Sequence, residues 1–144
     1  MDSFYFMLQK IRERPGLFMG KKSLEALTHF WSGYDYRGWV ENWEKTTGRG
    51  FFENYEEAQR SSTGCEPREQ HFMYGFEAFV HEYYDCMITT NNAMGLILEK
   101  SNSDEEAFDK FFELLDEFLT LTDEQKNKIM ENAQKRFQEY FEDI

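Results

Sequence analysis

Two helix-start motifs in the last third of the sequence constrain the fold more strongly than any other feature. Residues 103–106 (Ser-Asp-Glu-Glu) and 122–125 (Thr-Asp-Glu-Gln) both have the capping-box pattern, in which a hydroxyl and the side chain three residues later bond reciprocally to backbone amides. Apolar residues follow each box at helical spacing: Phe108, Phe111, Phe112, Leu115, Phe118 and Leu119 after the first, and Ile129, Met130, Ala133, Phe137, Tyr140 and Phe141 after the second. The pattern predicts a helical hairpin at the C-terminal end.

The same spacing predicts helices through most of the remaining sequence. A first helix over residues 3–14 is expected to stop at Pro15-Gly16, and Ser23 is placed to cap a second helix that bends at Gly33 or Gly38. Residues 46–67 are expected to form two loops around a brief helix. Further apolar residues at helical spacing predict a long helix and a weaker one after it, namely Phe72, Phe76, Phe79, Val80 and Tyr83, then Met94, Ile97 and Leu98.

The sequence contains no alternating apolar and polar segment of useful length, which argues against strands. A chain of 144 residues is long enough to bury one core and short for two. We therefore expect an all-α fold, with residues 1–144 forming a single-domain helical bundle of about five to seven helices.

Aromatic residues make up 18% of the chain, so large rings must fill much of the core. One shared core is predicted for Phe72, Phe76, Phe79, Phe108, Phe111, Phe112, Leu115, Phe118, Phe137 and Phe141. The basic residues near Pro15 predict a second tertiary contact, in which Arg12 or Arg14 pairs with Asp116 or Glu117. The alternative is that both arginines simply face the carboxyl end of their own helix.

The formal net charge of −12 disfavours binding to nucleic acid or to an anionic membrane surface and favours a basic partner. The first residues lack a signal-peptide pattern, and no apolar segment is long enough to span a bilayer. Cys65 and Cys86 are too few for a disulfide framework and are expected to be reduced thiols. These features predict a cytoplasmic protein.

Catalytic and metal-binding patterns are weak. Glu77, His81 and Asp85 follow i, i+4, i+8 on one predicted helix, but no second helix supplies a matching ligand motif, so a solvated face is the favoured interpretation. A pair of one cysteine with one histidine stays open, although a buried thiol is favoured for each cysteine. We expect no catalytic residue, no metal and no cofactor.

Several blocks of the sequence resemble one group of proteins. These blocks are Arg14-Pro15-Gly16-Leu17-Phe18-Met19-Gly20, Ser23-Leu24-Glu25-Ala26-Leu27, Phe30 to Tyr34, Ser103 to Phe108 and Phe111 to Leu119, and they lie towards both ends of the chain. They are similar to small bacterial proteins encoded beside polymorphic or contact-dependent growth inhibition toxins and regarded as immunity proteins. The resemblance implies a protein that binds a cognate toxin, expected to be a basic nuclease, and blocks its active site or substrate surface.

The charge distribution suggests where such a partner would bind. Residues 101–144 carry 13 acids and 5 bases, whereas residues 1–22 carry 2 acids and 5 bases. On the first capped helix of the hairpin, an acidic ridge is expected at Asp109, Glu113, Asp116 and Glu117, with aromatic anchors at Tyr34, Tyr36, Trp39 and Trp43. A non-catalytic adaptor of unknown partner is the alternative function, and a small hydrolase is a further one. The sequence leaves the oligomeric state open.

Overall fold

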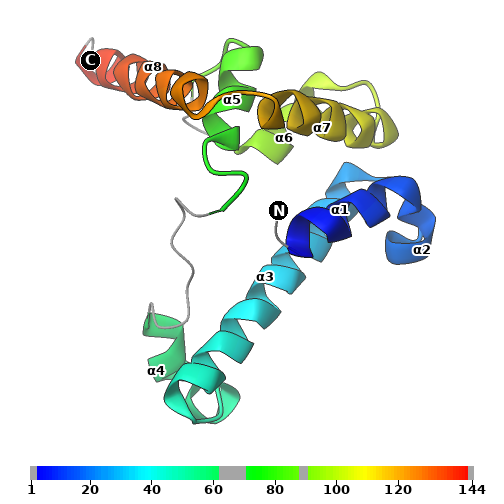
Figure 1. Cartoon of the computed structure of the whole chain (residues 1–144), viewed down its shortest axis with the longest axis vertical. Helices are drawn as coiled ribbons and strands as arrows, with labels where there is room; N and C mark the ends of the chain where they lie inside the picture. The colour runs from blue at the N-terminus through cyan, green and yellow to red at the C-terminus, as the bar shows by residue number, and fades with distance from the viewer. Residues whose placement is uncertain (1–2, 62–70, 88–90, 143–144) are drawn as a thin grey trace. The chain divides into compact units, whose positions relative to one another are not determined.

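The computed structural model describes residues 3–61, 71–87 and 91–142. These residues form eight α-helices and one 3-10 helix, and none of them lies in a strand. The helices are α1 (Ser3–Glu13), α2 (Pro15–Met19), α3 (Leu24–Thr47), η1 (Phe52–Asn54), α4 (Tyr55–Arg60), α5 (Phe76–Tyr83), α6 (Ala93–Lys100), α7 (Asp104–Leu119) and α8 (Asp123–Glu142) (Figure 1). The predicted all-α fold is confirmed.

The chain divides into two compact units, where the sequence suggested one domain. The first unit comprises Met1–Leu27 and Phe72–Ile144, and the second comprises Thr28–His71. The long helix α3 begins in the first unit and continues through the second. Each unit has its own buried aromatic residues, so each can be described by itself.

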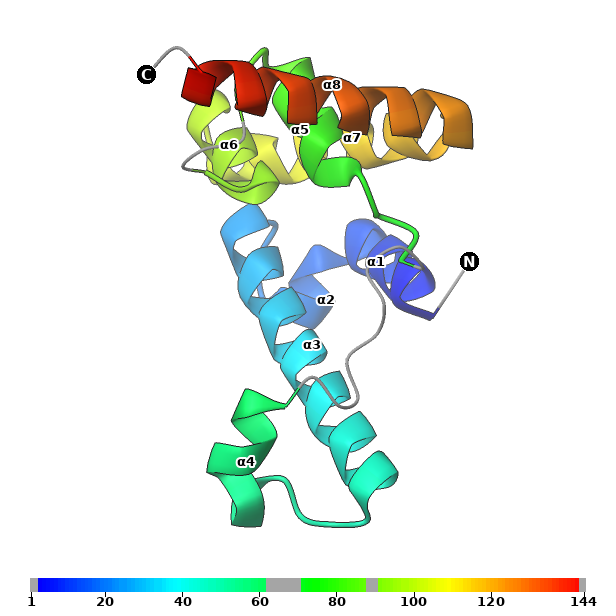
Figure 2. The same ribbon diagram turned by 90° about the vertical axis from the view of Figure 1, so that its left-hand side faces the viewer.

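Helix α5 lies at the centre of the first unit. It packs against α6, α7 and α8, which Figure 2 shows gathered around it, and α6 also packs against α7. The apolar stripe of α7 is buried along its length, at Ala107, Phe108, Phe111, Phe112, Leu114, Leu115 and Phe118. Rings of α5 meet this stripe, since Phe76 lies 5.7 Å from Phe111 and 5.5 Å from Phe118 between ring centroids.

The core prediction is wrong at two positions on α8. Phe137 is 41% exposed and Phe141 is 56% exposed, and their rings pack against each other at 4.8 Å. No residue of α8 is fully buried. The spacing of these rings identifies an apolar face on α8, but within the described residues no neighbouring helix covers its last turns.

The predicted helix starts are confirmed by their hydrogen bonds. The Ser103 hydroxyl accepts from the Glu106 amide at 3.0 Å, and the Ser23 hydroxyl accepts from the Ala26 amide at 2.9 Å. At Thr122 the capping box is reciprocal, because Thr122 Oγ1 accepts from the Gln125 amide and Gln125 Oε1 accepts from the Thr122 amide. These contacts satisfy amides that have no partner inside the helix.

The Pro-Gly segment differs from the prediction. Arg14 is not helical, and Pro15 begins the short helix α2 at its first position, where a missing amide hydrogen costs nothing. Gly20 then ends α2 in the left-handed conformation, with φ of 78°. Helix α3 continues through Gly33 and Gly38 as one helix. Within the described residues, no helix combines the length and apolar character that crossing a membrane requires.

The second unit is built around one buried phenyl ring. Phe51 is fully buried and lies between 5.0 and 6.1 Å from the rings of Trp39, Trp43, Tyr36, Phe52 and Tyr55, which come from α3, η1 and α4. Ala58 of α4 completes the buried cluster. The second unit thus has a compact aromatic core of its own.

Candidate functional site

The predicted acidic ridge lies on the solvent-facing side of α7. The side chains of Asp109, Glu113 and Asp116 are 63%, 68% and 50% exposed, and Glu117 is exposed as well. They occupy the face opposite the buried phenylalanines, as their spacing on a 3.6-residue helix requires. Carboxylates in this arrangement can hold lysine and arginine side chains.

Cations of the same chain already pair with three of these four carboxylates. Lys22 Nζ lies 2.7 Å from Asp109 Oδ2, and Lys110 Nζ lies 3.4 Å from Glu113 Oε1. Arg12 Nη1 lies 2.8 Å from Asp116 Oδ2, which confirms the predicted pairing of the N-terminal basic segment with α7. The ridge therefore holds the N-terminal segment of its own unit.

Arg12 makes a second contact on the same helix. Its guanidinium carbon lies 5.2 Å from the centroid of the Phe112 ring, within the range of a cation–π interaction. Both members of the Arg12–Asp116 pair stay substantially exposed, at 39% and 50%. Solvent screening therefore limits the stabilisation from this pair to roughly 0–1 kcal/mol.

Asp104 links the start of α7 to the start of α3. Its carboxylate accepts from the Ser23 hydroxyl, and its Oδ1 accepts from the Glu25 amide at 3.1 Å. Burial alone would raise the pKa of Asp104, but the hydrogen bonds from Ser23 and from the amides of Glu25 and Leu24 outweigh it and hold the pKa below its usual value. Asp104 is a structural residue that sequence analysis assigned only to the capping box.

Glu113 and Glu117 are the carboxylates of the ridge that the N-terminal segment does not use. They are one helical turn apart, and the contact of Glu113 with Lys110 comes from its own helix. The Glu117 carbonyl accepts from the Thr120 hydroxyl at 2.6 Å, and its side chain makes no ion pair with the described residues. These two side chains are the part of the ridge best placed to meet another molecule.

The four predicted aromatic anchors lie on α3 in the second unit and differ in exposure. Tyr34 and Tyr36 are exposed, and Trp39 is partly buried against Phe51. Trp43 is only 1% exposed, so its ring contributes to the core of the second unit and is closed to a partner. The structure does not bring these four residues together with the ridge in one unit, because the ridge belongs to the first unit.

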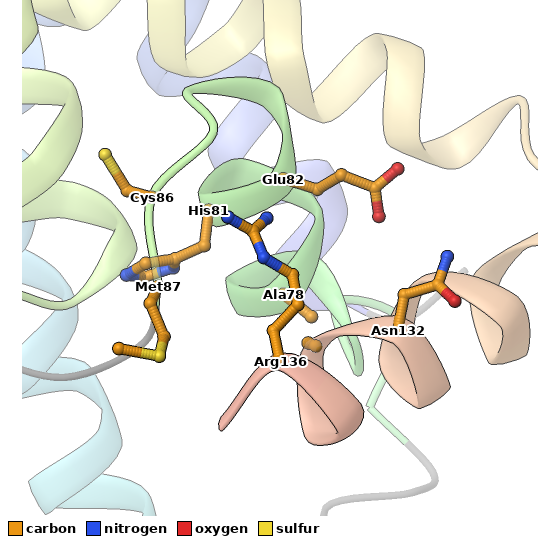
Figure 3. A pocket seen from close by; sticks show the side chains of 8 residues that line it. Ala78, His81, Glu82, Cys86, Met87, Asn132 and Arg136 are labelled. Atoms are coloured by element: carbon orange, nitrogen blue, oxygen red, sulfur yellow. The ribbon is translucent and has the colours of Figure 1, made fainter. Parts of the chain in front are cut away.

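A small cavity in the first unit contains the residue types that a hydrolase would need. It is lined by His81, Glu82 and Cys86 from α5 and the residues after it, and by Asn132 and Arg136 from α8 (Figure 3). Its volume is about 20 Å³, which corresponds to roughly one water molecule. The cavity is too small to admit a substrate.

His81 is also unavailable as a general base in this arrangement. It is 2% exposed, its Nδ1 lies 2.8 Å from the Glu77 carbonyl and its Nε2 lies 2.9 Å from the Asn91 carbonyl. Both ring nitrogens thus face backbone carbonyl oxygens, and a neutral imidazole donates to one of the two. His81 therefore joins α5 to the segment that precedes α6. The interpretation of Glu77, His81 and Asp85 as one solvated face is wrong for His81, which is part of the core.

Other reactive side chains around this cavity have structural partners. The Cys86 thiol donates to the Tyr84 carbonyl at 3.4 Å, and Arg136 Nη2 lies 3.1 Å from Asp85 Oδ1. Burial raises the pKa of Glu77, although the Ala93 amide and His81 oppose the shift. No three His, Cys, Asp or Glu side chains in the described ranges are grouped closely enough to hold a metal ion. Cys65 lies outside the described residues.

Comparison with known proteins adds no relative. No protein-family model matches the chain, and neither a curated protein nor a solved structure matches it significantly.

Proposed function

We propose that this chain is a non-catalytic immunity protein, which acts in the cytoplasm by binding a basic toxin domain and blocking its active site or substrate surface. A basic nuclease is the partner class that fits best, because its substrate phosphates are held by lysine and arginine side chains. Carboxylates that occupy those cations would compete directly with the substrate.

One observation carries this proposal: the carboxylates of α7 form a row that already binds cationic side chains. Nitrogen atoms of Arg12, Lys22 and Lys110 lie within 3.4 Å of these carboxylates. The paired carboxylate side chains are nevertheless 50–68% exposed. The row is supported by the buried phenylalanine stripe of α7, so its geometry is fixed before a partner arrives. A preformed acidic surface increases both the association rate and the specificity for a basic partner.

The cavity beside His81 favours a binding function over a hydrolase. It has room for about one water molecule, and both nitrogens of its histidine face backbone carbonyl oxygens. A hydrolytic site needs a base that can reach the proton of a bound nucleophile. An adaptor role would use the same surfaces, and only the identity of the partner separates it from the immunity role.

The test uses the purified product of the adjacent gene as the partner and measures association with the parent chain and with the variant E113K/E117K. We expect association at least about 10-fold slower for the variant, because two repulsive contacts replace two attractive ones, and a smaller difference at high salt. The matched control is E139K/E142K, which reverses two exposed carboxylates on α8. Each reversal adds two charges, so both variants move the net charge from −12 to −8.

The control separates local contact from total charge. Equal slowing in both variants would show that only the net charge matters and would place the interface away from Glu113 and Glu117. Unchanged association in both variants, with both well folded by circular dichroism, would contradict the proposal that the ridge binds the partner.

A further inference from the structure

Three exposed rings in the second unit form a continuous surface, which we call the aromatic shelf: Tyr36, Phe52 and Tyr55. They are 41%, 66% and 42% exposed. The ring centroids of Phe52 and Tyr55 lie 6.3 Å apart with planes only 13° from parallel, and Tyr36 lies 6.4 Å from Phe52. Three large rings exposed side by side are unusual on a surface that contacts only water.

The buried ring of Phe51 supports all three rings of the shelf. Each of its three rings contacts the buried ring of Phe51, at 6.0 Å from Tyr36, 5.2 Å from Phe52 and 6.1 Å from Tyr55. Gln59 also fixes the outer edge by donating to the Tyr55 hydroxyl at 3.1 Å. A partner would therefore meet a preformed surface and would not have to order these side chains.

Elsewhere in this protein, cations cover the faces of aromatic rings. Among the described residues, the pairs are Arg12 on Phe112 at 5.2 Å, Arg49 on Trp43 at 5.5 Å, Lys110 on Tyr83 at 4.7 Å and Lys126 on Phe118 at 4.7 Å. In three of them the cation also pairs with a carboxylate, respectively Asp116, Glu57 and Glu113. A ring face with a carboxylate beside it is thus the recurrent cation site of this chain.

The Arg49 site shows this chemistry in the second unit itself. Its guanidinium stacks over Trp43, forms a two-point contact with the Glu57 carboxylate and donates to Asn54 Oδ1 at 2.9 Å. A planar guanidinium suits such a site better than an ammonium, because it stacks on a ring and bonds sideways at once.

The segment that carries the shelf is acidic. Glu53 and Glu56 are both exposed, and they follow Phe52 and Tyr55 in the sequence. No lysine or arginine among the described residues lies over Tyr36, Phe52 or Tyr55. A cation supplied by another molecule would complete a site of this kind.

We propose that the aromatic shelf binds an arginine-bearing segment of a protein partner, with the guanidinium on the ring faces and Glu53 or Glu56 as its counter-charge. The inference rests on the proposed function for the existence of a basic partner, and it adds a second contact surface in a different unit. Nucleic acid bases also stack on aromatic rings, but their phosphates would meet carboxylates here.

The test measures binding of two fluorescent peptides, nine arginines and nine lysines, by anisotropy. The parent chain should bind the arginine peptide about 5- to 10-fold more tightly than the lysine peptide, and the shelf variant F52S/Y55S should lose that preference. The control F137S/F141S removes two phenyl rings of similar exposure from α8 and should keep it. The ridge variant E113K/E117K should bind both peptides more weakly and keep the preference.

The outcomes separate the two proposals. An arginine preference that survives in F52S/Y55S, or that is absent from the parent, overturns the shelf as an arginine site, while the proposed function is judged by association with the toxin. Sedimentation supplies another check. A parent dimer that F52S/Y55S converts to a monomer would show that a second copy of this chain covers the shelf, which also overturns the proposal.

Discussion

The ridge on α7 and the aromatic shelf are both suited to bind cations, but cations of the described chain occupy only the ridge. On α7, Arg12 and Lys22 of the same chain already lie against Asp116 and Asp109, and a ring of the core lies beneath Arg12. The shelf exposes its rings on an acidic segment, and no described cation covers them. An acidic, aromatic surface can therefore be an internal contact in one unit and an open one in the other.

This difference changes how the ridge should be tested. A reversal at Asp109 or Asp116 would break an internal ion pair as well as any external contact, so its effect on a partner would be ambiguous. Glu113 and Glu117 avoid this problem, because neither pairs with the N-terminal segment among the described contacts.

The largest effect is expected from the core that supports the ridge. Phe111→Ala should lower the free energy of unfolding by about 3–5 kcal/mol, because the ring is fully buried and its removal leaves a cavity. Phe141→Ala removes an exposed ring and should change the free energy of unfolding by less than about 0.5 kcal/mol. Urea unfolding of both variants measures this. Equal destabilisation would mean that the last turns of α8 belong to the core.

Phe51→Ala should have a similar cost that is confined to the second unit. Five rings lose their common contact, so amides of residues 39–58 should exchange with solvent much faster, whereas those of α7 should stay protected. Hydrogen exchange resolved by residue checks this. Loss of protection in α7 to the same extent would show that the two units unfold as one.

The contact between Asp104 and the start of α3 should appear as a pH-dependent contribution. Asp104→Asn should cost about 1–2 kcal/mol at pH 7, because it weakens bonds to Ser23 and to the Glu25 amide. The folded pKa of Asp104 is below its unfolded value of about 3.9, so its contribution is present above that pH and is lost as the pH falls through the folded pKa.

Thermal unfolding of the parent and Asp104→Asn from pH 7 down to pH 2 measures this contribution. The difference in stability should shrink at the acid end of the range. A difference that stays constant over the whole range would indicate that the asparagine disturbs packing and that the charge of Asp104 is unimportant.

The smallest effect is expected for the exposed pair of Arg12 and Asp116. A double-mutant cycle with Arg12→Ala and Asp116→Ala should give a coupling energy of no more than about 1 kcal/mol, which decreases as salt is added. Arg12→Ala alone should cost slightly more than Asp116→Ala, because it also removes the contact with Phe112. A coupling above about 2 kcal/mol would indicate a pair that is shielded from solvent.

Local sequence patterns predicted the features that depend on neighbouring residues. Helix starts at Ser23, Ser103 and Thr122 could be located because their hydrogen bonds reach only three residues along the chain. The buried face of α7 could also be assigned, since its stripe is wide and continuous. The Arg12–Asp116 pair could also be predicted, because basic residues are few in this acidic chain.

Features that depend on distant segments were not predictable in the same way. Periodicity placed Phe137 and Phe141 on one face of a helix but could not show where the neighbouring helix ends. His81 lies at a spacing typical of a solvated helix face, and only the Asn91 carbonyl, supplied by a later segment, explains its burial. Of the three shelf rings, only Tyr36 was singled out from the sequence. Phe52 and Tyr55 lie in the segment for which only a brief helix between two loops was predicted.

The central claim is that this protein neutralises a basic toxin through the acidic ridge, and growth of bacterial cells tests it most directly. The product of the adjacent gene is tested as the toxin, and it is co-expressed with the parent chain, with E113K/E117K or with the control E139K/E142K. The parent and the control should restore growth, and E113K/E117K should fail to do so although it accumulates as a folded protein. Full protection by E113K/E117K, or no protection by the parent, would contradict the claim.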